Sequence, residues 1–274
     1  MSEQVFRWKE WTRPVTPVSR EVLTSQPADE IDLTRPPLLF VPGYAHGAWV
    51  FAEKWLEHAA GRGYQAYAMS LRGHGDSGSA PGTTLRAYAH DVVQVAARLP
   101  RQAVLIGHGV GALAVAQALS RYPARAGVLL APVIGGPRTL AAALRHNPIG
   151  TVPGLFGAPL RLGRRQLFGK ELPVGQARQY ADRMGDPDAP RVVYQLARRH
   201  LPQRPVGGAP VLVVGSPDDR VVPRASLVRI ARHYGVAPLL FPGMGHDLML
   251  DARWQEPIDA ILDWLEKEPA AADR

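Results

Sequence analysis

A glycine-rich pentapeptide has the spacing of a catalytic turn but lacks the reactive side chain. Residues 107–111 read Gly-His-Gly-Val-Gly, after an apolar run and before a segment of small residues. This pattern is typical of a strand, a tight turn and a helix, where G-x-S-x-G presents a nucleophilic serine at its centre. The central residue here is Gly109. The sequence therefore predicts a turn built for nucleophilic chemistry whose central position carries no side chain.

The elements that would position this turn follow from the apolar pattern. Helical patterns separate six apolar runs, which indicates a parallel sheet covered on both faces, an α/β, mostly parallel, doubly wound fold. The first 35 residues are expected to add an antiparallel edge hairpin. The predicted strands are 38–43, 64–73, 102–109, 125–133, 209–216 and 236–243, and the main predicted helices are 48–63, 83–100, 110–123, 223–235 and 253–268.

The loops at the carboxyl ends of these strands are where ligands bind in such sheets. An acidic pair, Asp218 and Asp219, follows the fifth predicted strand, and His246 follows the sixth. A carboxylate on one imidazole nitrogen fixes the tautomer, so that the other nitrogen can take a proton. The loop 72–78 contains His74 and Asp76, to which we assign a structural role, tying loops together. It lacks the Lys-Ser/Thr pair of a phosphate-binding loop.

Five segments together make the chain resemble the α/β-hydrolase superfamily, in its branch of small esterases, lipases and related cap-bearing enzymes. They occur in the family's order between residues 38 and 251, and read FVPGYAHGAW, SLRGHGDSG, IGHGVGA, GSPDDRVVP and GMGHDLMLD. The resemblance implies a core domain formed by residues 1–133 and 209–274. The segment 134–208, rich in Pro, Gly and Arg, breaks the alternation of strands and helices and is expected to form a helical cap over the sheet.

The resemblance also implies roles for individual residues. His246 matches the catalytic base and Asp219 the acid that orients it, with Asp218 as the second choice. Gly109 stands where the family carries its nucleophile. The backbone N–H groups of Tyr44 and Val110 would form the oxyanion hole.

The expected substrate is an ester-type small molecule that is largely apolar. This follows from apolar side chains of the cap segment, namely Leu155, Phe156, Leu160, Leu162, Leu167 and Phe168. Packing within the cap is the alternative explanation for these side chains. The side chains we expect to contact substrate are His46, His108, Phe156, Phe168 and Met244.

Three interpretations of Gly109 remain open on sequence grounds. In the first, Gly109 is an inactivating change, natural or engineered, in a serine esterase. In the second, the enzyme works without a covalent intermediate and uses Asp219 and His246 as a general base for direct hydrolysis, proton abstraction, cyclisation or elimination. In the third, the chain is a binding protein that uses the pocket as a receptor. The intact Asp/His pair argues against a pure receptor. Glycine accepts the strained backbone of such a turn freely, so the fold is expected to tolerate it.

Composition excludes several other classes of protein. The chain has 274 residues and no cysteine, which excludes disulfides and thiol catalysis. We expect no cofactor and no metal site, because the nine histidines are scattered without a ligand pattern. The N-terminal residues MSEQVFRWKEW lack the apolar core of a signal peptide. No apolar run reaches the roughly 18 residues of a membrane span, so a cytoplasmic protein is expected.

The net charge of +8 is concentrated in one segment. Residues 133–207 contain 11 Arg and 1 Lys against 1 Glu and 3 Asp, and the rest of the chain has 20 basic and 20 acidic residues. No basic helix with interleaved aromatic residues is present, so we expect no nucleic-acid partner. The excess is typical of a solvated surface. The alternative is a segment that attracts an anionic ligand, including an anionic substrate, or an anionic lipid surface.

Overall fold

A single sheet forms the centre of the molecule. The computed structural model describes residues 15–28, 31–156, 158, 160–185, 190–196 and 203–267, with the side chains of residues 154 and 155 outside that description. Within these residues, seven strands pair in the order β1-β3-β2-β4-β5-β6-β7. β1 runs antiparallel to β3 and the other pairings are parallel. The strands are Val22–Ser25 (β1), Leu38–Val41 (β2), Ala66–Met69 (β3), Val104–His108 (β4), Ala126–Leu130 (β5), Val211–Gly215 (β6) and Leu239–Leu240 (β7).

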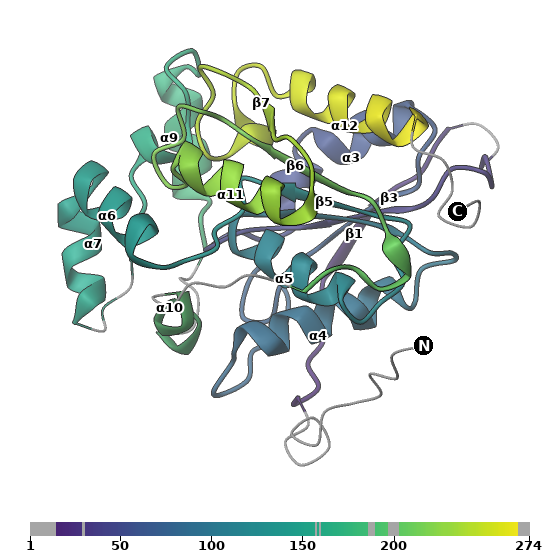
Figure 1. Cartoon of the computed structure of the whole chain (residues 1–274), viewed down its shortest axis with the longest axis horizontal. Coiled ribbons are helices and arrows are strands. Elements are labelled where there is room, and N and C mark those ends of the chain that lie inside the picture. Colours follow the sequence, from purple (N-terminus) through teal and green to yellow (C-terminus); the bar gives the residue numbers. More distant parts are fainter. Residues whose placement is uncertain are drawn as a thin grey trace.

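Helices cover both faces of this sheet, because its central strands are apolar on both sides. One apolar cluster joins the sheet to α2, α3 and α12, and a second joins it to α4, α5 and α11. The two layers lie on opposite sides of the strands in Figure 1. The expected mostly parallel α/β fold is confirmed. The helices are Trp49–Ala52 (α2), Trp55–Gly61 (α3), Leu85–Ala96 (α4), Gly109–Leu119 (α5), Arg224–Tyr234 (α11) and Gln255–Lys267 (α12), with the 3₁₀ turns Val206–Gly208 (η1) and Leu248–Leu250 (η2).

The segment between β5 and β6 contains further short helices, which gather at one end of the molecule in Figure 1. We call residues 134–208 the cap segment. Its described helices are Pro137–His146 (α6), Pro148–Leu155 (α7), Arg164–Leu167 (α8), Val174–Asp182 (α9) and Pro190–Leu196 (α10).

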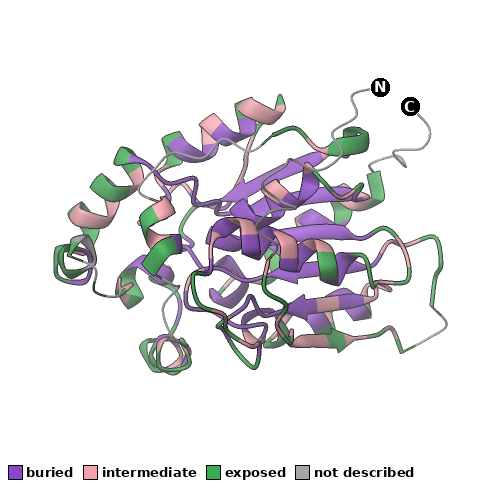
Figure 2. Ribbon diagram, turned by 90° about the horizontal axis from the view of Figure 1, so that it is seen from below, coloured by how far each residue is buried: buried purple, intermediate pink, exposed green. Residues whose placement is uncertain are grey.

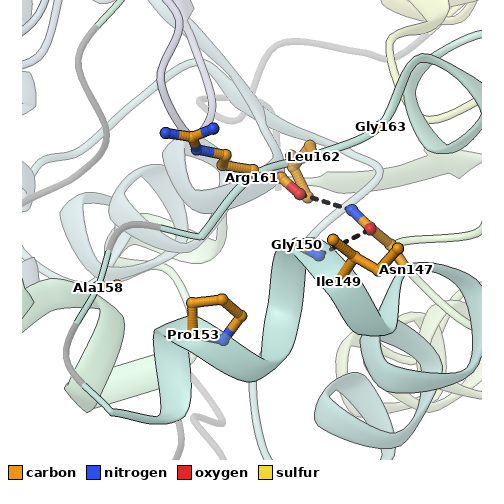
Figure 3. Close-up of a pocket in the computed structure, with 8 residues that line it drawn as sticks. All are labelled: Asn147, Ile149, Gly150, Pro153, Ala158, Arg161, Leu162 and Gly163. Atoms are coloured by element: carbon orange, nitrogen blue, oxygen red, sulfur yellow. Dashed lines mark hydrogen bonds between the residues drawn. The ribbon is translucent and has the colours of Figure 1, made fainter.

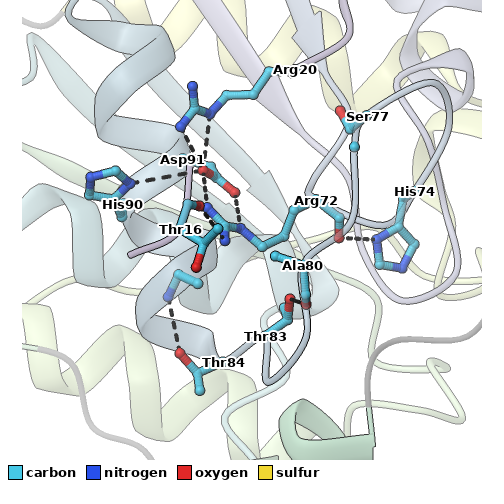
Figure 4. Close-up of polar contacts among 12 residues, drawn as sticks. Thr16, Arg20, Arg72, His74, Ser77, Ala80, Thr83, Thr84, His90 and Asp91 are labelled. Atoms are coloured by element: carbon cyan, nitrogen blue, oxygen red, sulfur yellow. Dashed lines mark hydrogen bonds and ion pairs between the residues drawn. The ribbon is translucent and has the colours of Figure 1, made fainter. Parts of the chain in front are cut away.

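A buried ion pair fastens the loop after β3 to α4. The guanidinium of Arg72 donates two hydrogen bonds to Asp91, from Nε at 2.6 Å and from Nη2 at 2.7 Å. Arg20 donates a third from Nε at 3.0 Å (Figure 4). Asp91 is fully buried, so these bonds join the segment before β1, the loop after β3 and α4 beneath the surface.

Two local expectations were wrong, and a third was wrong in part. The described part of the first 35 residues contains one strand, β1, which pairs with β3 instead of with a second N-terminal strand. The helix expected over 48–63 is two helices, because Lys54 between them has a non-helical backbone with φ −149°. In the loop 72–78, His74 is buried and its ring packs edge-on against Tyr88 of α4, as a structural role requires. The side chain of Asp76 is exposed, and Arg72 makes the anchoring bonds to α4.

Candidate active site

The turn between β4 and α5 has the geometry that its glycines predict. Gly109 has φ +55°, in the left-handed region. A Cβ at Gly107 would lie 2.5 Å from the carbonyl oxygen of Gly111, and a Cβ at Gly111 would overlap the carbonyl oxygen of Pro42. Since neither position has room for a side chain, the strand and the helix pack directly against each other around Gly109.

The side chain of His246 points at the backbone of Gly109. A Cβ at Gly109 would lie 3.2 Å from His246 Nε2 and 3.6 Å from Gly43 Cα. Gly109, at the start of α5, and His246, after β7, thus meet at the carboxyl ends of the strands. The space that a side chain at residue 109 would occupy faces the imidazole nitrogen that is free to take a proton.

The opposite nitrogen of His246 is held by Asp219. His246 Nδ1 donates to Asp219 Oδ2 at 2.8 Å. The other carboxylate oxygen of Asp219 accepts from the backbone N–H groups of Val221 and Val222, at 2.7 and 2.9 Å. Asp218, the alternative acid, is exposed and accepts instead from the backbone N–H of Gly243 at 2.7 Å. Of the two acids, the structure brings Asp219 to His246.

The pKa of His246 is raised by its carboxylate neighbours. Burial is the largest influence and lowers this pKa, but the charge and hydrogen bond of Asp219, together with the charge of Asp247, outweigh it and raise the pKa above the usual value of 6.5. The pair is therefore electrostatically arranged to stabilise a protonated imidazole, as a general base requires.

A second buried network lies beside this pair, and the sequence analysis did not find it as a network. Asp247 is fully buried, and its Oδ2 lies 3.2 Å from His46 Nε2. His46 Nδ1 lies 2.6 Å from the carbonyl oxygen of Tyr44. His46 thus lies between two acceptors, the carbonyl oxygen of Tyr44 and the carboxylate of Asp247. The signal in the sequence was the acid directly after His246, in GMGHD.

His108 completes this network from the end of β4. Its Nε2 donates to the carbonyl oxygen of His246 at 3.1 Å and lies 3.5 Å from Asp247 Oδ1, and the two imidazole rings are 4.6 Å apart. Burial, followed by the charge of His246, lowers the pKa of His108 to about 3. His108 is thus neutral, and its Nδ1, which faces Gly43, has no hydrogen-bond partner among the described residues.

The ligand atoms of His108, His246 and Asp247 lie within 4.8 Å of one another, a spacing that a metal ion could use. However, Asp219 holds Nδ1 of His246, and the backbone of His246 holds Nε2 of His108. A metal would have to break these bonds or use the remaining nitrogen of each ring. We assign no metal to this cluster.

Of the other expected site residues, most lie in the interior or bond to the cap segment, whereas Phe156 is exposed. Val110 is buried directly after Gly109, and Tyr44 Oη donates to the carbonyl oxygen of Leu160 in the cap segment at 2.9 Å. Met244 and Phe168 are also buried. Phe156 is 86% exposed, so the structure does not bring it to the His246 pair. The side chain of Leu155 lies outside the described residues.

A groove of about 970 Å³ runs between the cap segment and the loops after β6 and β7. Phe168 and Met244 line it, and it reaches Asp219 and Gly245 in the loops after β6 and β7. Its walls carry the basic side chains of Arg164, Arg165, Lys170 and Arg220 and the acidic side chains of Glu171 and Asp218, together with His146. The groove thus offers apolar surface and charges of both signs beside Asp219.

Comparison with known proteins gives a consistent result. The family model described as "Alpha/beta hydrolase family" matches residues 38–263. The monoacylglycerol lipase of Paleococcus ferrophilus is 20% identical, with 91% of this chain and 98% of that chain covered and a TM-score of 0.67. A soluble variant of Saccharomyces cerevisiae monoglyceride lipase, in complex with a substrate analog, is 15% identical, with 92% and 93% covered and a TM-score of 0.74.

A thermophilic esterase from Thermogutta terrifontis is 16% identical, with 91% of this chain and 94% of that chain covered and a TM-score of 0.66. No curated protein matches the chain. At these identities the solved structures show the fold. In the described part of the chain, no helix combines the length and apolar character that crossing a membrane demands.

Proposed function

The chain belongs to the alpha/beta hydrolase family, and we propose that Gly109, Asp219 and His246 form an esterase- or lipase-like active site in which Gly109 occupies the nucleophile position. One observation carries this proposal. A side chain at residue 109 would start 3.2 Å from His246 Nε2, at the tip of the turn and in the left-handed backbone conformation. A serine hydroxyl at this position would be within reach of the base.

The proposed substrate is a largely apolar ester-type small molecule. Buried Phe168 and Met244 line the groove next to Asp219, and the relatives named above include lipases and esterases. The four basic side chains of the same groove outnumber its acids, Glu171, Asp218 and Asp219, and suit a substrate or product that carries a carboxylate. The backbone N–H groups of Tyr44 and Val110 are the proposed oxyanion donors.

The mechanism of the Gly109→Ser variant would follow from these contacts. His246 Nε2 takes the serine proton as Oγ attacks the ester carbonyl, while Asp219 stabilises the imidazolium through Nδ1. The N–H groups of Tyr44 and Val110 bind the oxyanion, and the proton then passes from His246 to the leaving alcohol. Water hydrolyses the acyl-enzyme with His246 again acting as base.

The test compares hydrolysis of short- and medium-chain p-nitrophenyl esters by the chain with Gly109, by Gly109→Ser and by Gly109→Ala. We expect Gly109→Ser to be faster by several orders of magnitude, because loss of a triad serine costs roughly a factor of 10⁶ in turnover. The alanine variant controls for the added Cβ and should gain nothing. A folded Gly109→Ser variant that is no faster than Gly109→Ala contradicts the proposal.

A second candidate function is supported by the open position next to His246 Nε2. With no side chain at Gly109, a water molecule or a substrate proton could be placed directly against the base, and Asp219–His246 would catalyse direct hydrolysis, cyclisation or proton abstraction. If the chain with Gly109 turns over a substrate, and His246→Ala abolishes that turnover while Gly109→Ser does not increase it, this candidate replaces the first.

A further inference from the structure

Two helices of the cap segment stand away from the core. All residues of α6 are described and none of them is buried. α7 packs against α6. In Figure 1, both helices lie at the left end of the molecule, away from the central sheet. In Figure 2, the helices at this end are mostly exposed or half-buried, in contrast to the buried strands.

The outward side of α7 is apolar. Ile149 is 88% exposed, Val152 is 42% exposed, and Phe156, one residue beyond the helix, is 86% exposed. Positions i, i+3 and i+7 lie on one side of a helix, and Gly150 and Thr151, on its other side, are buried. We call Ile149, Val152 and Phe156 the docking face. Large apolar side chains gathered on an exposed helix mark an interaction surface.

The surroundings of the docking face are strongly cationic. Residues 134–170 contain five arginines and one lysine and no acidic residue. Arg138, Arg145 and Arg161 are exposed, and none of the ion pairs in the described part of the chain includes them. α7 itself carries no basic residue; the arginines lie on α6 and at residue 161. Apolar and cationic side chains on one surface segment are what binding to the interface of an anionic membrane uses.

The docking face is also indented. A hollow of about 450 Å³ opens between α7 and a wall formed by Ala158 and residues 161–163, with Ile149, Pro153 and Leu162 among its lining residues (Figure 3). Asn147 holds the two walls together, since its Nδ2 donates to the carbonyl oxygen of Arg161 and its Oδ1 accepts from the backbone N–H of Gly150. The hollow adds apolar surface next to the exposed stripe.

We propose that the docking face binds the surface of an anionic lipid bilayer, with Ile149, Val152 and Phe156 among the acyl chains and Arg138, Arg145 and Arg161 at the lipid phosphates. A bilayer supplies apolar and anionic surface together. A second copy of the chain does not, because pairing two such faces would bring their uncompensated arginines together. The inference concerns α6 and α7 and does not depend on catalysis at Gly109.

The test measures co-sedimentation of the full chain with vesicles of phosphatidylcholine alone, or of phosphatidylcholine mixed with phosphatidylglycerol. We expect binding to the mixed vesicles that weakens at high salt, and little binding to the neutral ones. The double substitution Ile149→Glu/Phe156→Glu should reduce the partition coefficient roughly tenfold or more. Its control is Leu33→Glu, which replaces a side chain that is 71% exposed before β2, at the amino ends of the strands.

The electrostatic part is tested with Arg138→Gln/Arg145→Gln/Arg161→Gln, for which we expect a loss of roughly fivefold per arginine. Arg98→Gln, at an exposed arginine after α4, is the matched control. All replaced side chains are exposed, and a thermal melt checks that each variant is folded. In the Gly109→Ser background, these substitutions should leave hydrolysis of soluble esters unchanged, which separates this test from that of the proposed function.

Three results would overturn the inference. In the first, the unsubstituted chain fails to bind the mixed vesicles. In the second, Leu33→Glu lowers vesicle binding as much as Ile149→Glu/Phe156→Glu does. In the third, Ile149→Glu/Phe156→Glu changes the oligomeric state in solution and leaves vesicle binding intact, which would show that the docking face is a protein interface.

Discussion

His46 Nε2 lies 3.2 Å from Asp247 Oδ2, a contact between residues 201 positions apart. This contact places a second buried carboxylate next to His246, although His246 itself bonds to Asp219. The site therefore contains two aspartates with different tasks. Asp219 orients the base directly, whereas Asp247 holds His46 and adds negative charge nearby.

The substitution Asp247→Asn should lower the pKa of His246, because it removes one of the charges that raise it. Asp219→Asn should lower this pKa further, since it removes a closer charge and changes the hydrogen bond at Nδ1. An NMR titration of the His246 ring protons measures both shifts. An unchanged His246 pKa in Asp247→Asn would show that Asp247 has only a packing role.

The pH dependence of the Gly109→Ser variant follows from the same raised pKa. The base must be unprotonated to act, so activity should increase with pH along a limb whose midpoint lies above the usual histidine value of about 6.5. Adding Asp219→Asn should move this limb to lower pH while it reduces the maximal rate. A pH–rate profile of kcat/KM reads the free-enzyme value, and a limb that stays in place contradicts the assignment of His246 as base.

A side chain at residue 109 should destabilise the fold even where it restores chemistry. At φ +55°, a residue with a Cβ costs roughly 1–3 kcal/mol, and the Cβ would press on His246 Nε2. Gly109→Ala and Gly109→Ser should both lower the free energy of unfolding by about this amount in a urea titration. Gly61→Ala, at a helical glycine with open space around its Cβ, is the control and should be neutral or stabilising.

The ion pair of Arg72 with Asp91 should contribute strongly to stability when only one partner is removed. Asp91→Ala leaves Arg72 buried without its carboxylate, and such losses cost about 3–5 kcal/mol. Glu256→Gln breaks the exposed pair with Arg253 and should change stability by no more than about 0.5 kcal/mol. Denaturant unfolding of both variants gives the comparison. Equal losses of unfolding free energy in the two variants would show that the buried pair contributes no more to stability than the exposed one.

His108 should make the protein less stable in mild acid. Its folded pKa of about 3 lies below the unfolded value of about 6.5, so between these values the unfolded chain binds a proton that the native state does not. Stability is then lost as the pH falls, by up to about 1.4 kcal/mol per pH unit. Denaturant unfolding between pH 7 and pH 4 should show a shallower loss for His108→Asn, and equal slopes would rule out this contribution.

Much of the core could be predicted because its physical signals are local. Buried parallel strands need continuous apolar runs, and β2, β4, β5 and β6 fall within the predicted ones. The glycines around residue 109 follow from close packing of a strand on a helix. Thr84 caps α4 by accepting from the backbone N–H of Ala87, which is also a short-range feature of the sequence.

The remaining features depend on distant parts of the chain. Whether His46 faces substrate or a buried acid is decided by Asp247, which the topology brings from the other end of the sequence. Phe156 was expected at the substrate because it is one of several apolar side chains of the cap segment. In the structure it is exposed, as are Ile149 and Val152 of α7, and the packing of α7 on α6 and on residues from elsewhere in the cap segment is a tertiary feature.

The uneven distribution of charge also makes the molecule electrically asymmetric. The cap helices gather at one end (Figure 1), and residues 133–207 carry the whole net charge of +8, while the remainder is balanced. The protein therefore has a large electric dipole moment along the axis from core to cap. At low ionic strength, an anionic surface should orient the approaching protein so that the cap segment makes the first contact. The association rate should therefore fall more steeply with ionic strength than it would if the same net charge were spread evenly over the molecule.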